Sequence, residues 1–394
     1  MKITVPTIDF GTSKIVTMVA QSNGERCDIV GSGAVPYSGY LQDGWNNPDE
    51  IRDVIRTAID QAQKTGNCRI HELNVGVPGM FTRVIVKEVH VSLTGPDPHV
   101  TAQDVRACFK LAEESGGDRI IHSAPAWFRV DDGKKTLSPV GIKGRELSAM
   151  IALVTADKYF IDDITYRLRD MDIEPREFYS TVAGEATYAL SQDERDKTAM
   201  LIDIGYLCTD VMVMEGDALI FHKCLDIGGG HISADIAEQL NIPFPFVEEK
   251  IKQTYSFNST NQDETYVIPA TEDEPARTVR RDEVTPIIEA KVEEIAEAIN
   301  KALEEGGVKL GKWSNVYLTG GGLIFNKGGK DFLAGKLHRI IREAQRTNNK
   351  MTSHVFSSAV GLTILVVTTQ EEQKAPEGGA KGLFSRAFRW LMGY

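Results

Sequence analysis

The feature that most constrains the fold of this chain is an apolar, β-prone run ending in Asp-x-Gly, which occurs twice, about half a chain apart. The copies are ITVPTIDFGTSK (3–14) and AMLIDIGYLCTDVMVM (199–214). A hairpin whose turn carries Asp and Gly presents backbone N–H groups and hydroxyls at its tip, as an anion cradle requires. Two such hairpins facing each other would clamp a polyphosphate. A third glycine-bearing segment, VYLTGGGLIFNKGG (316–329), also follows an apolar run.

The charge balance limits the class of protein. The 394 residues carry 56 acidic and 44 basic side chains, which gives a formal charge of −12. This length suits about two to four domains, and the ordinary globular composition excludes a disordered or fibrous protein. The acidic balance argues against nucleic-acid binding, because each phosphate contact needs a Lys or Arg. It would also repel an anionic membrane surface.

The cysteines and the apolar segments indicate the compartment. The five cysteines are an odd number without C-x-x-C spacing, so they suggest neither a disulfide framework nor a zinc site. The chain begins with a strand-like run, and no stretch reaches the ~18–20 continuous apolar residues of a spanning helix. We therefore expect a protein that is made in the cytosol and stays there.

Helical periodicity and strand patterns organise the rest of the chain. Residues 47–65 are predicted to form an amphipathic helix capped by Asn47, with Pro48 at its first position. Short alternating strands around one helix from Thr101 predict an inserted α+β subdomain over about 79–157. The remaining predictions are a loop or edge hairpin over 258–281, a long helix over 283–305, an apolar helix over 356–367 and a Pro/Gly-containing linker after it.

The C-terminal residues LFSRAFRWLMGY (383–394) differ in charge from the body. The last fourteen residues carry +3 and the remainder −15. At helical spacing an apolar stripe lies opposite Ser385 and the arginines, which is typical of an interfacial membrane anchor. The alternative is a helix docked on the protein's own core or on a partner groove. One short helix binds weakly, so an anchor implies polymerisation to raise avidity. The membrane-contacting candidates are Leu383, Phe384, Arg386, Phe388, Arg389, Trp390 and Leu391.

Three stretches of the inserted block resemble a known family. They are RIIHSAPAWFRVDDG (119–133), PVGIKGREL (139–147) and IALVT (151–155), and they are similar to the signature SHS2 subdomain of the bacterial FtsA cell-division family. That family belongs to the actin-like ATPase superfamily, whose order of Asp-Gly hairpin, Asp-Gly hairpin and Thr-Gly-Gly-Gly turn this chain shares. The segment GGGHISADIAEQLNIP (228–243) and the C-terminal helix resemble the family too.

The resemblance implies an α/β, actin-like (ribonuclease H-type) two-lobed fold with an inserted α+β subdomain and a C-terminal amphipathic helix. The implied domains are subdomain 1A (1–80, 158–198 and 355–369), inserted subdomain 1C (81–157), subdomain 2A (199–240 and 316–354), subdomain 2B (241–315), a linker (370–381) and a membrane-targeting helix (382–394).

The two hairpins and the glycine turn supply the candidate nucleotide site. A carboxylate at each tip, Asp9 and Asp203, can hold first-shell waters of Mg²⁺. Three glycines after a buried strand suit a backbone pressed against a nucleotide. Each motif also has a purely structural interpretation. The Asp-Gly pairs can be ordinary hairpin turns, the glycine run can be a structural turn, and the segment around Glu249 can be a charged surface helix. The other cofactor-binding candidates are Gly11, Thr12, Ser13, Lys14, Gly205, Thr209, Thr319, Gly320, Gly321 and Gly322, and the resemblance adds Glu249 and Lys252 as adenosine contacts.

Two departures from the family pattern bear on catalysis. The family's second phosphate loop reads Asp-x-Gly-Gly-Gly-Thr-Thr-Asp, whereas this chain has Tyr206, Leu207 and Cys208 after Gly205. Bulky side chains obstruct close backbone approach. Where relatives often carry Glu-Pro, this chain has Ser180-Thr181, and Glu185 is the nearest downstream carboxylate. With Asp9, Asp203 and Glu185 as the catalytic candidates, we expect ATP binding with slow or absent hydrolysis. Cys208 is either a reactive thiol or, more commonly, a small buried apolar residue.

The functional expectation that the resemblance implies is a membrane-tethered, ATP- and Mg²⁺-binding filament protein. Such a protein binds the C-terminal peptide of the tubulin-like protein FtsZ through 240–315, recruits later division proteins, and lies on the cytoplasmic inner face of the membrane at the division septum. A second hypothesis is a related actin-like scaffold of a pilus or secretion platform that binds a membrane partner's cytoplasmic peptide. A third is a sugar or acetate kinase on the same fold.

Overall fold

The computed structural model describes residues 3–374 apart from positions 25, 43, 115, 118, 262, 271–274, 312–313 and 345–352. The predicted C-terminal helix 382–394 lies outside the described residues. The contacts divide the chain into two compact units. Unit 1 comprises Met1–Met200, Met212–His222 and Gln345–Tyr394, and unit 2 comprises Leu201–Val211 and Lys223–Ala344.

The main sheet of unit 1 has the strand order β10-β6-β1-β2-β3. β1 and β2 are antiparallel, with Asp9 opposite Val16, while β6 runs parallel to both β1 and β10. A short two-stranded sheet, β4 with β5, accompanies it. The strands are β1 (Ile3–Phe10), β2 (Lys14–Ser22), β3 (Cys27–Pro36), β4 (Tyr40–Leu41), β5 (Gly44–Trp45), β6 (Glu72–Val77) and β10 (Glu174–Ser180).

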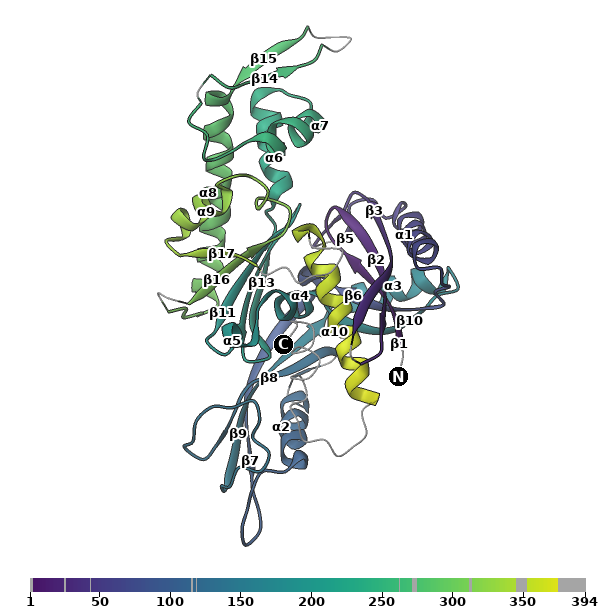
Figure 1. Cartoon of the computed structure of the whole chain (residues 1–394), viewed down its shortest axis with the longest axis vertical. Helices are drawn as coiled ribbons and strands as arrows, with labels where there is room; N and C mark the ends of the chain where they lie inside the picture. The colour runs from purple at the N-terminus through teal and green to yellow at the C-terminus, as the bar shows by residue number, and fades with distance from the viewer. Residues whose placement is uncertain are drawn as a thin grey trace. The chain divides into compact units, whose positions relative to one another are not determined.

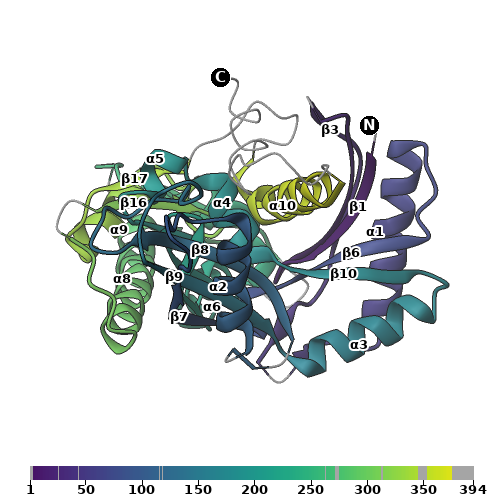
Figure 2. The ribbon, with the colours of Figure 1, turned by 90° about the horizontal axis from the view of Figure 1, so that it is seen from below.

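Helices cover both faces of this sheet (Figure 2). On one face α1 and α3 bury apolar residues such as Ile55 and Phe160 against Ile8 and Val75. On the other face α10 buries Leu362 and Val366. The helical elements here are α1 (Ile51–Gly66), α3 (Lys158–Arg169), α4 (Thr181–Ala189), α5 (Gln192–Arg195), the 3-10 turn His354–Phe356 and α10 (Ser357–Lys374).

Two helix ends differ from the sequence prediction. α1 begins at Ile51 rather than at Pro48, and Glu50 rather than Asn47 is its N-cap. The Glu50 carboxylate accepts a hydrogen bond from the backbone N–H of Ser38 at 2.7 Å rather than capping the helix. α10 continues to Lys374, five residues into the predicted linker 370–381. In this additional part of the helix, Gln370 is buried and its side-chain amide donates to Asn74 of β6 at 3.2 Å.

The inserted α+β block predicted for about 79–157 is present. A 3-10 turn (Gly79–Phe81) leads into an antiparallel sheet of order β7-β9-β8, and Figure 1 shows α2 packed beside it. Val105 and Cys108 of α2 pack on Leu147 and Ile151 of β9. α2 starts at Ala102, one residue after the predicted start at Thr101. The elements are β7 (Thr82–Ser92), α2 (Ala102–Glu114), β8 (Ile120–Val130) and β9 (Glu146–Ala156).

The second sheet has the order β13-β12-β11-β16-β17, and a separate antiparallel pair, β14 with β15, confirms the edge hairpin predicted within 258–281. The long helix predicted over 283–305 is α8, which begins two residues earlier. The strands are β11 (Ala199–Ile204), β12 (Thr209–Glu215), β13 (Ala218–Leu225), β14 (Thr265–Ile268), β15 (Arg277–Arg280), β16 (Asn315–Thr319) and β17 (Ile341–Glu343). The helices are α6 (Gly229–Leu240), α7 (Phe244–Phe246), the π-helix η2 (Val247–Lys252), α8 (Arg281–Glu305) and α9 (Gly329–Leu337).

Candidate functional site

The first hairpin, β1 with β2, fixes its tip through backbone bonds. The N–H of Gly11 donates to the carbonyl of Lys14 at 3.1 Å, and the N–H of Tyr37 donates to the carbonyl of Ser13 at 3.2 Å. The hydroxyl of Tyr37 also donates to the carbonyl of Gly11 at 2.7 Å. Thr12 is buried, while Gly11, Ser13 and Lys14 are half-buried. The five candidates from Asp9 to Lys14 therefore form one ordered tip in unit 1.

Asp9 is a buried carboxylate held by two hydroxyls. It is 3% exposed. The Ser358 hydroxyl of α10 donates to it at 2.8 Å, and the Thr181 hydroxyl of α4 lies at 3.4 Å. Burial raises the pKa of Asp9 above its ordinary value, and Ser358, Lys14 and Thr181 oppose that rise. The two hydroxyls orient the carboxylate but do not fully offset the cost of burying its negative charge. A divalent cation would supply the positive charge that offsets this cost.

Ser358 was not among the residues that the sequence indicated. It lies in a helix of ordinary apolar pattern, and 349 residues separate it from Asp9. No local motif marks it. The contact depends on α10 packing across the sheet, which only the folded chain establishes.

Glu185 lies at the contact between α4 and α10. It is 1% exposed. The two helices approach so closely that a Cβ on Gly361 would meet the Cα of Glu185 at 2.5 Å. The two glycines, Gly184 and Gly361, permit this approach. The helix contact places Glu185 in the interior of unit 1, and its role in positioning water stays a prediction.

In unit 2 the second hairpin, β11 with β12, closes tightly. The N–H of Gly205 donates to the carbonyl of Cys208 at 2.9 Å. The Thr209 hydroxyl donates to the carbonyl of Ile227 at 2.7 Å, and Thr209 is fully buried. Thr209 therefore uses its hydroxyl to fasten β12 to the segment that leads into α6.

Three glycine-bearing segments meet around Asp203. The N–H of Gly229 donates to the carbonyl of Gly205 at 2.9 Å, and the N–H of Gly230 donates to the carbonyl of Tyr206 at 2.7 Å. The N–H of Gly322 donates to the carbonyl of Ile204 at 2.7 Å. We call 203–206, 228–230 and 320–322 the glycine cluster. Thr319, which precedes the third segment, is fully buried. The structure thus brings together the candidates Asp203, Gly205, Thr319, Gly320, Gly321 and Gly322.

Gly320 tolerates no side chain and, unlike the other glycines that crowd the cluster, has a positive φ. Its φ is +86°, and a Cβ would lie 2.0 Å from Oδ1 of Asp203 and 2.3 Å from the carbonyl oxygen of Ile204. The positive φ alone would strain any residue with a Cβ.

The segment Gly228–Gly230 was not among the predicted site residues, although it belongs to the stretch that resembles the family. Its glycine run was the signal that could have placed it there.

Lys252 pairs with Glu248 rather than Glu249. The Lys252 ammonium lies 3.2 Å from Oε1 of Glu248 and 5.9 Å from the centre of the Tyr206 ring. Burial lowers the pKa of Lys252, and Glu248 opposes that change. Glu249 is exposed. η2 is a π-helix with more than 3.6 residues per turn, so residues four apart align better than residues three apart. The contact of Lys252 with Tyr206 places it beside the glycine cluster, whereas Glu249 does not share that position.

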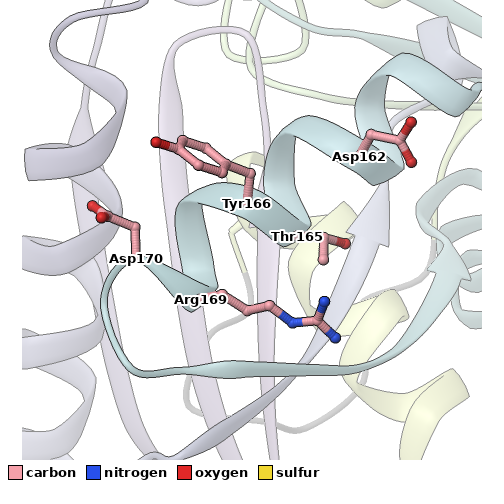
Figure 3. A pocket seen from close by; sticks show the side chains of 5 residues that line it. All are labelled: Asp162, Thr165, Tyr166, Arg169 and Asp170. Atoms are coloured by element: carbon pink, nitrogen blue, oxygen red, sulfur yellow. The ribbon is translucent and has the colours of Figure 1, made fainter.

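A separate pocket of about 420 Å³ lies along α3 (Figure 3). Its lining side chains come from successive turns of one helix and include Tyr166, which is 73% exposed. Its three charged residues, Asp162, Arg169 and Asp170, form ion pairs with Lys158, Glu174 and Arg52, respectively. No predicted site residue lines this pocket.

No helix among the described residues is long and apolar enough to cross a membrane.

Comparison with known proteins identifies two family models. The model "Cell division protein FtsA" matches residues 200–361, and the model "SHS2 domain inserted in FTSA" matches residues 79–155. The Pseudomonas aeruginosa cell division protein FtsA is 24% identical and covers 98% of this chain and 97% of its own length. The Bacillus subtilis FtsA is 26% identical over 76% of this chain and 70% of its own length.

Solved structures agree on the fold. The PilM–PilN type IV pilus biogenesis complex aligns with a TM-score of 0.61 at 17% identity, covering 93% of this chain and 99% of that one. MreB5 of Spiroplasma citri bound to ADP aligns with a TM-score of 0.55 at 11% identity, covering 95% of this chain and 99% of the MreB5 chain. These likenesses confirm the predicted actin-like α/β fold, and the second family model confirms the insertion. The chain therefore belongs to the FtsA family of bacterial cell-division proteins.

Proposed function

We propose that this chain is a membrane-tethered, ATP-binding protein that polymerises on the inner face of the cell membrane at the division septum. It anchors FtsZ through the FtsZ C-terminal peptide, bound by 240–315, and recruits later division proteins. The observation that supports nucleotide binding most directly is the glycine cluster, where Gly320 leaves no room for a Cβ beside Asp203. The MreB5 structures with ADP and AMPPNP, which share the fold, are consistent with this proposal.

Each hairpin supplies one carboxylate to the Mg²⁺ of bound ATP in this proposal. Asp9 and Asp203 act through metal-bound waters, because Mg²⁺ keeps several waters when it bridges phosphates. The cation offsets the charge of the triphosphate. Gly11, Thr12, Ser13 and Lys14 supply hydrogen-bond donors, and Gly205 and Gly320–Gly322 allow close backbone approach. Lys252 and Glu248 hold the adenosine, with Glu249 as the exposed alternative.

Hydrolysis is proposed to be slow or absent. Tyr206 stands where the family pattern has a glycine, and its ring lies so near Gly230 that a Cβ there would meet ring carbons at 3.1 Å. Ser180-Thr181 replaces a Glu-Pro pair, which leaves Glu185 as the nearest downstream carboxylate. Phosphate release at a rate typical of chaperone-class ATPases would contradict this part of the proposal.

Replacing Lys252 by Met tests the adenosine contact. We expect several-fold weaker ATP binding but little loss in the free energy of unfolding, because burial already disfavours the Lys252 charge and Met has a similar volume. Titration calorimetry and urea unfolding measure the two effects. Lys250→Met is the matched control, since Lys250 lies in the same π-helix but is exposed. Equal ATP affinity in both variants would remove Lys252 from the site.

Membrane attachment is tested by co-sedimentation with anionic liposomes. We expect the full chain to sediment with the vesicles, more strongly with ATP, and to form filaments visible by electron microscopy. Deleting 382–394 should abolish vesicle binding, since the remaining chain is strongly acidic. A related pilus or secretion scaffold, the second candidate that the PilM–PilN likeness favours, needs no anchor of its own and would sediment equally with and without these residues.

A matched pair of variants separates helix amphipathicity from length. The double substitution Phe388→Gln and Leu391→Gln removes apolar groups from the predicted membrane face, at about 0.8 kcal/mol per buried CH₂. We expect vesicle binding to fall at least about tenfold. Ser385→Gln introduces the same side chain on the predicted polar face and should bind like the unmodified chain. Equal loss in both variants would contradict an amphipathic anchor.

A further inference from the structure

Three potential metal ligands meet where β12 and β13 lie side by side in unit 2. Cys208 directly precedes β12, Asp210 is the second residue of β12, and Cys224 is the penultimate residue of β13. The two sulfur atoms and a carboxylate oxygen of Asp210 all lie within 4.8 Å of one another. The five cysteines have no C-x-x-C spacing, so the sequence predicted no zinc site. The pairing of β12 with β13 brings Cys208 and Cys224 together.

The ligand set and its spacing fit a Zn²⁺-class ion. Zn²⁺ binds thiolate at about 2.3 Å and carboxylate at about 2.0–2.2 Å in a tetrahedron, which separates neighbouring ligand atoms by roughly 3.4–3.8 Å. Side-chain shifts of roughly 1 Å close the observed spacing to these values. Two soft thiolates select such a metal over Mg²⁺ or Ca²⁺, which prefer oxygen. Three protein ligands leave the fourth position for water.

The backbone beneath the cluster is already fixed. The carbonyl of Cys208 accepts from the N–H of Gly205 at 2.9 Å, and the hydroxyl of the intervening Thr209 donates to Ile227 at 2.7 Å. Preorganised ligands on strands lose little entropy on binding. Cys208 is buried, whereas Asp210 and Cys224 are half-buried, so an ion can reach the cluster from solvent.

A bound dication would displace the thiol protons and stabilise both thiolates beside the Asp210 carboxylate.

We propose that Cys208, Asp210 and Cys224 bind one divalent transition-metal ion of the Zn²⁺ class, with water as the fourth ligand. Because Cys208 ends the turn of the second hairpin, the ion would fasten that turn to β13. Cys208 and Asp210 flank Thr209 in the second phosphate loop, so the site adjoins the proposed nucleotide site, but its test needs no nucleotide.

The test uses the full chain, reduced and freed of metal by a chelator. Zn²⁺ affinity is measured by competition with a chromophoric chelator, and Co²⁺ serves as the spectroscopic probe. We expect one ion per chain and a thiolate-to-cobalt charge-transfer band in the near ultraviolet. Cys208→Ser and Cys224→Ser should each lower affinity at least about tenfold, since even outer partners of metal ligands contribute that much, and should weaken the band. Asp210→Asn should lower affinity but keep the band.

Cys68→Ser is the matched control, because Cys68 is also half-buried but belongs to unit 1; it should leave affinity and band unchanged. A second measurement needs no variant: bound Zn²⁺ should protect Cys208 and Cys224 from alkylation, read by mass spectrometry, while Cys68 keeps its reactivity. The proposal is overturned if Co²⁺ gives no charge-transfer band with a chain whose five thiols are all shown to be reduced by thiol titration. So does unchanged Zn²⁺ affinity in the Cys208→Ser/Cys224→Ser double variant.

Discussion

Replacing Asp9 by Asn is expected to weaken Mg·ATP binding by about 10–100-fold, the effect typical of losing an outer partner of a metal site. The same change should stabilise the nucleotide-free chain by about 0.5–2 kcal/mol at neutral pH, because it removes a buried charge that the fold does not fully compensate. The Ser358 hydroxyl can still donate to the Asn side-chain oxygen, so the hydrogen bond is kept. Titration calorimetry and urea unfolding measure the two effects.

The stability gain of Asp9→Asn should depend on pH with a defined sign. Burial raises the pKa of Asp9 in the folded chain above the unfolded value. The folded state therefore holds this proton more tightly, so the contribution of Asp9 to stability is fully present below the unfolded pKa and is lost as the pH rises through the folded pKa. The variant's advantage should be small near pH 4 and should grow as the pH rises towards neutrality.

A surface substitution controls for net charge in this experiment. Asp60→Asn changes the charge of the chain equally, but Asp60 is exposed on α1. It should alter neither ATP affinity nor the pH dependence of stability. Unchanged Mg·ATP affinity in Asp9→Asn would remove Asp9 from the proposed site, and an unchanged pH dependence would contradict its raised pKa.

Replacing Gly320 by Ala is expected to lower the free energy of unfolding by about 2–4 kcal/mol. The positive φ contributes about 1 kcal/mol, and the overlap of the new Cβ with Asp203 and Ile204 contributes about 1–3 kcal/mol. Relief of this overlap requires the second hairpin to move, so we also expect ATP binding to be lost or strongly weakened. Urea unfolding and calorimetry give both values.

Gly307→Ala isolates the backbone contribution. Gly307 belongs to the same unit and has φ +64°, but a Cβ there meets nothing within 4 Å. We expect it to cost about 1 kcal/mol and to leave ATP affinity unchanged. If the two alanine variants were equally stable, the close approach of Gly320 to Asp203 would not be a constraint on this chain.

The sequence predicted those elements whose signals are local. The long helix α8 follows from helical periodicity, and the β14–β15 hairpin from a polar segment between stronger patterns. The inserted block follows from alternating strands. In each case the residues that specify the element lie within it or beside it in the chain. The fold class came from the resemblance to the FtsA family, which implied it.

Helix boundaries and pairings depended on contacts that no local pattern contains. Beside the start of α1 the carboxylate of Glu50 accepts from the backbone of Ser38, and near the end of α10 the side chain of Gln370 donates to Asn74 of the sheet. The partner of Lys252 is Glu248 because the segment forms a π-helix, whereas spacing alone fits Glu249 equally well.

The sequence by itself determined that two hairpins present carboxylates and glycines at their tips, because turn chemistry is encoded within a few residues. Only the tertiary structure decided what surrounds them. Packing of α10 brings Ser358 to Asp9, the start of α6 brings Gly229 and Gly230 to the second hairpin, and strand pairing brings Cys224 to Cys208. Contacts between residues far apart in the chain form when apolar faces pack and strands pair. No local sequence pattern specifies which distant residue will lie beside a given side chain.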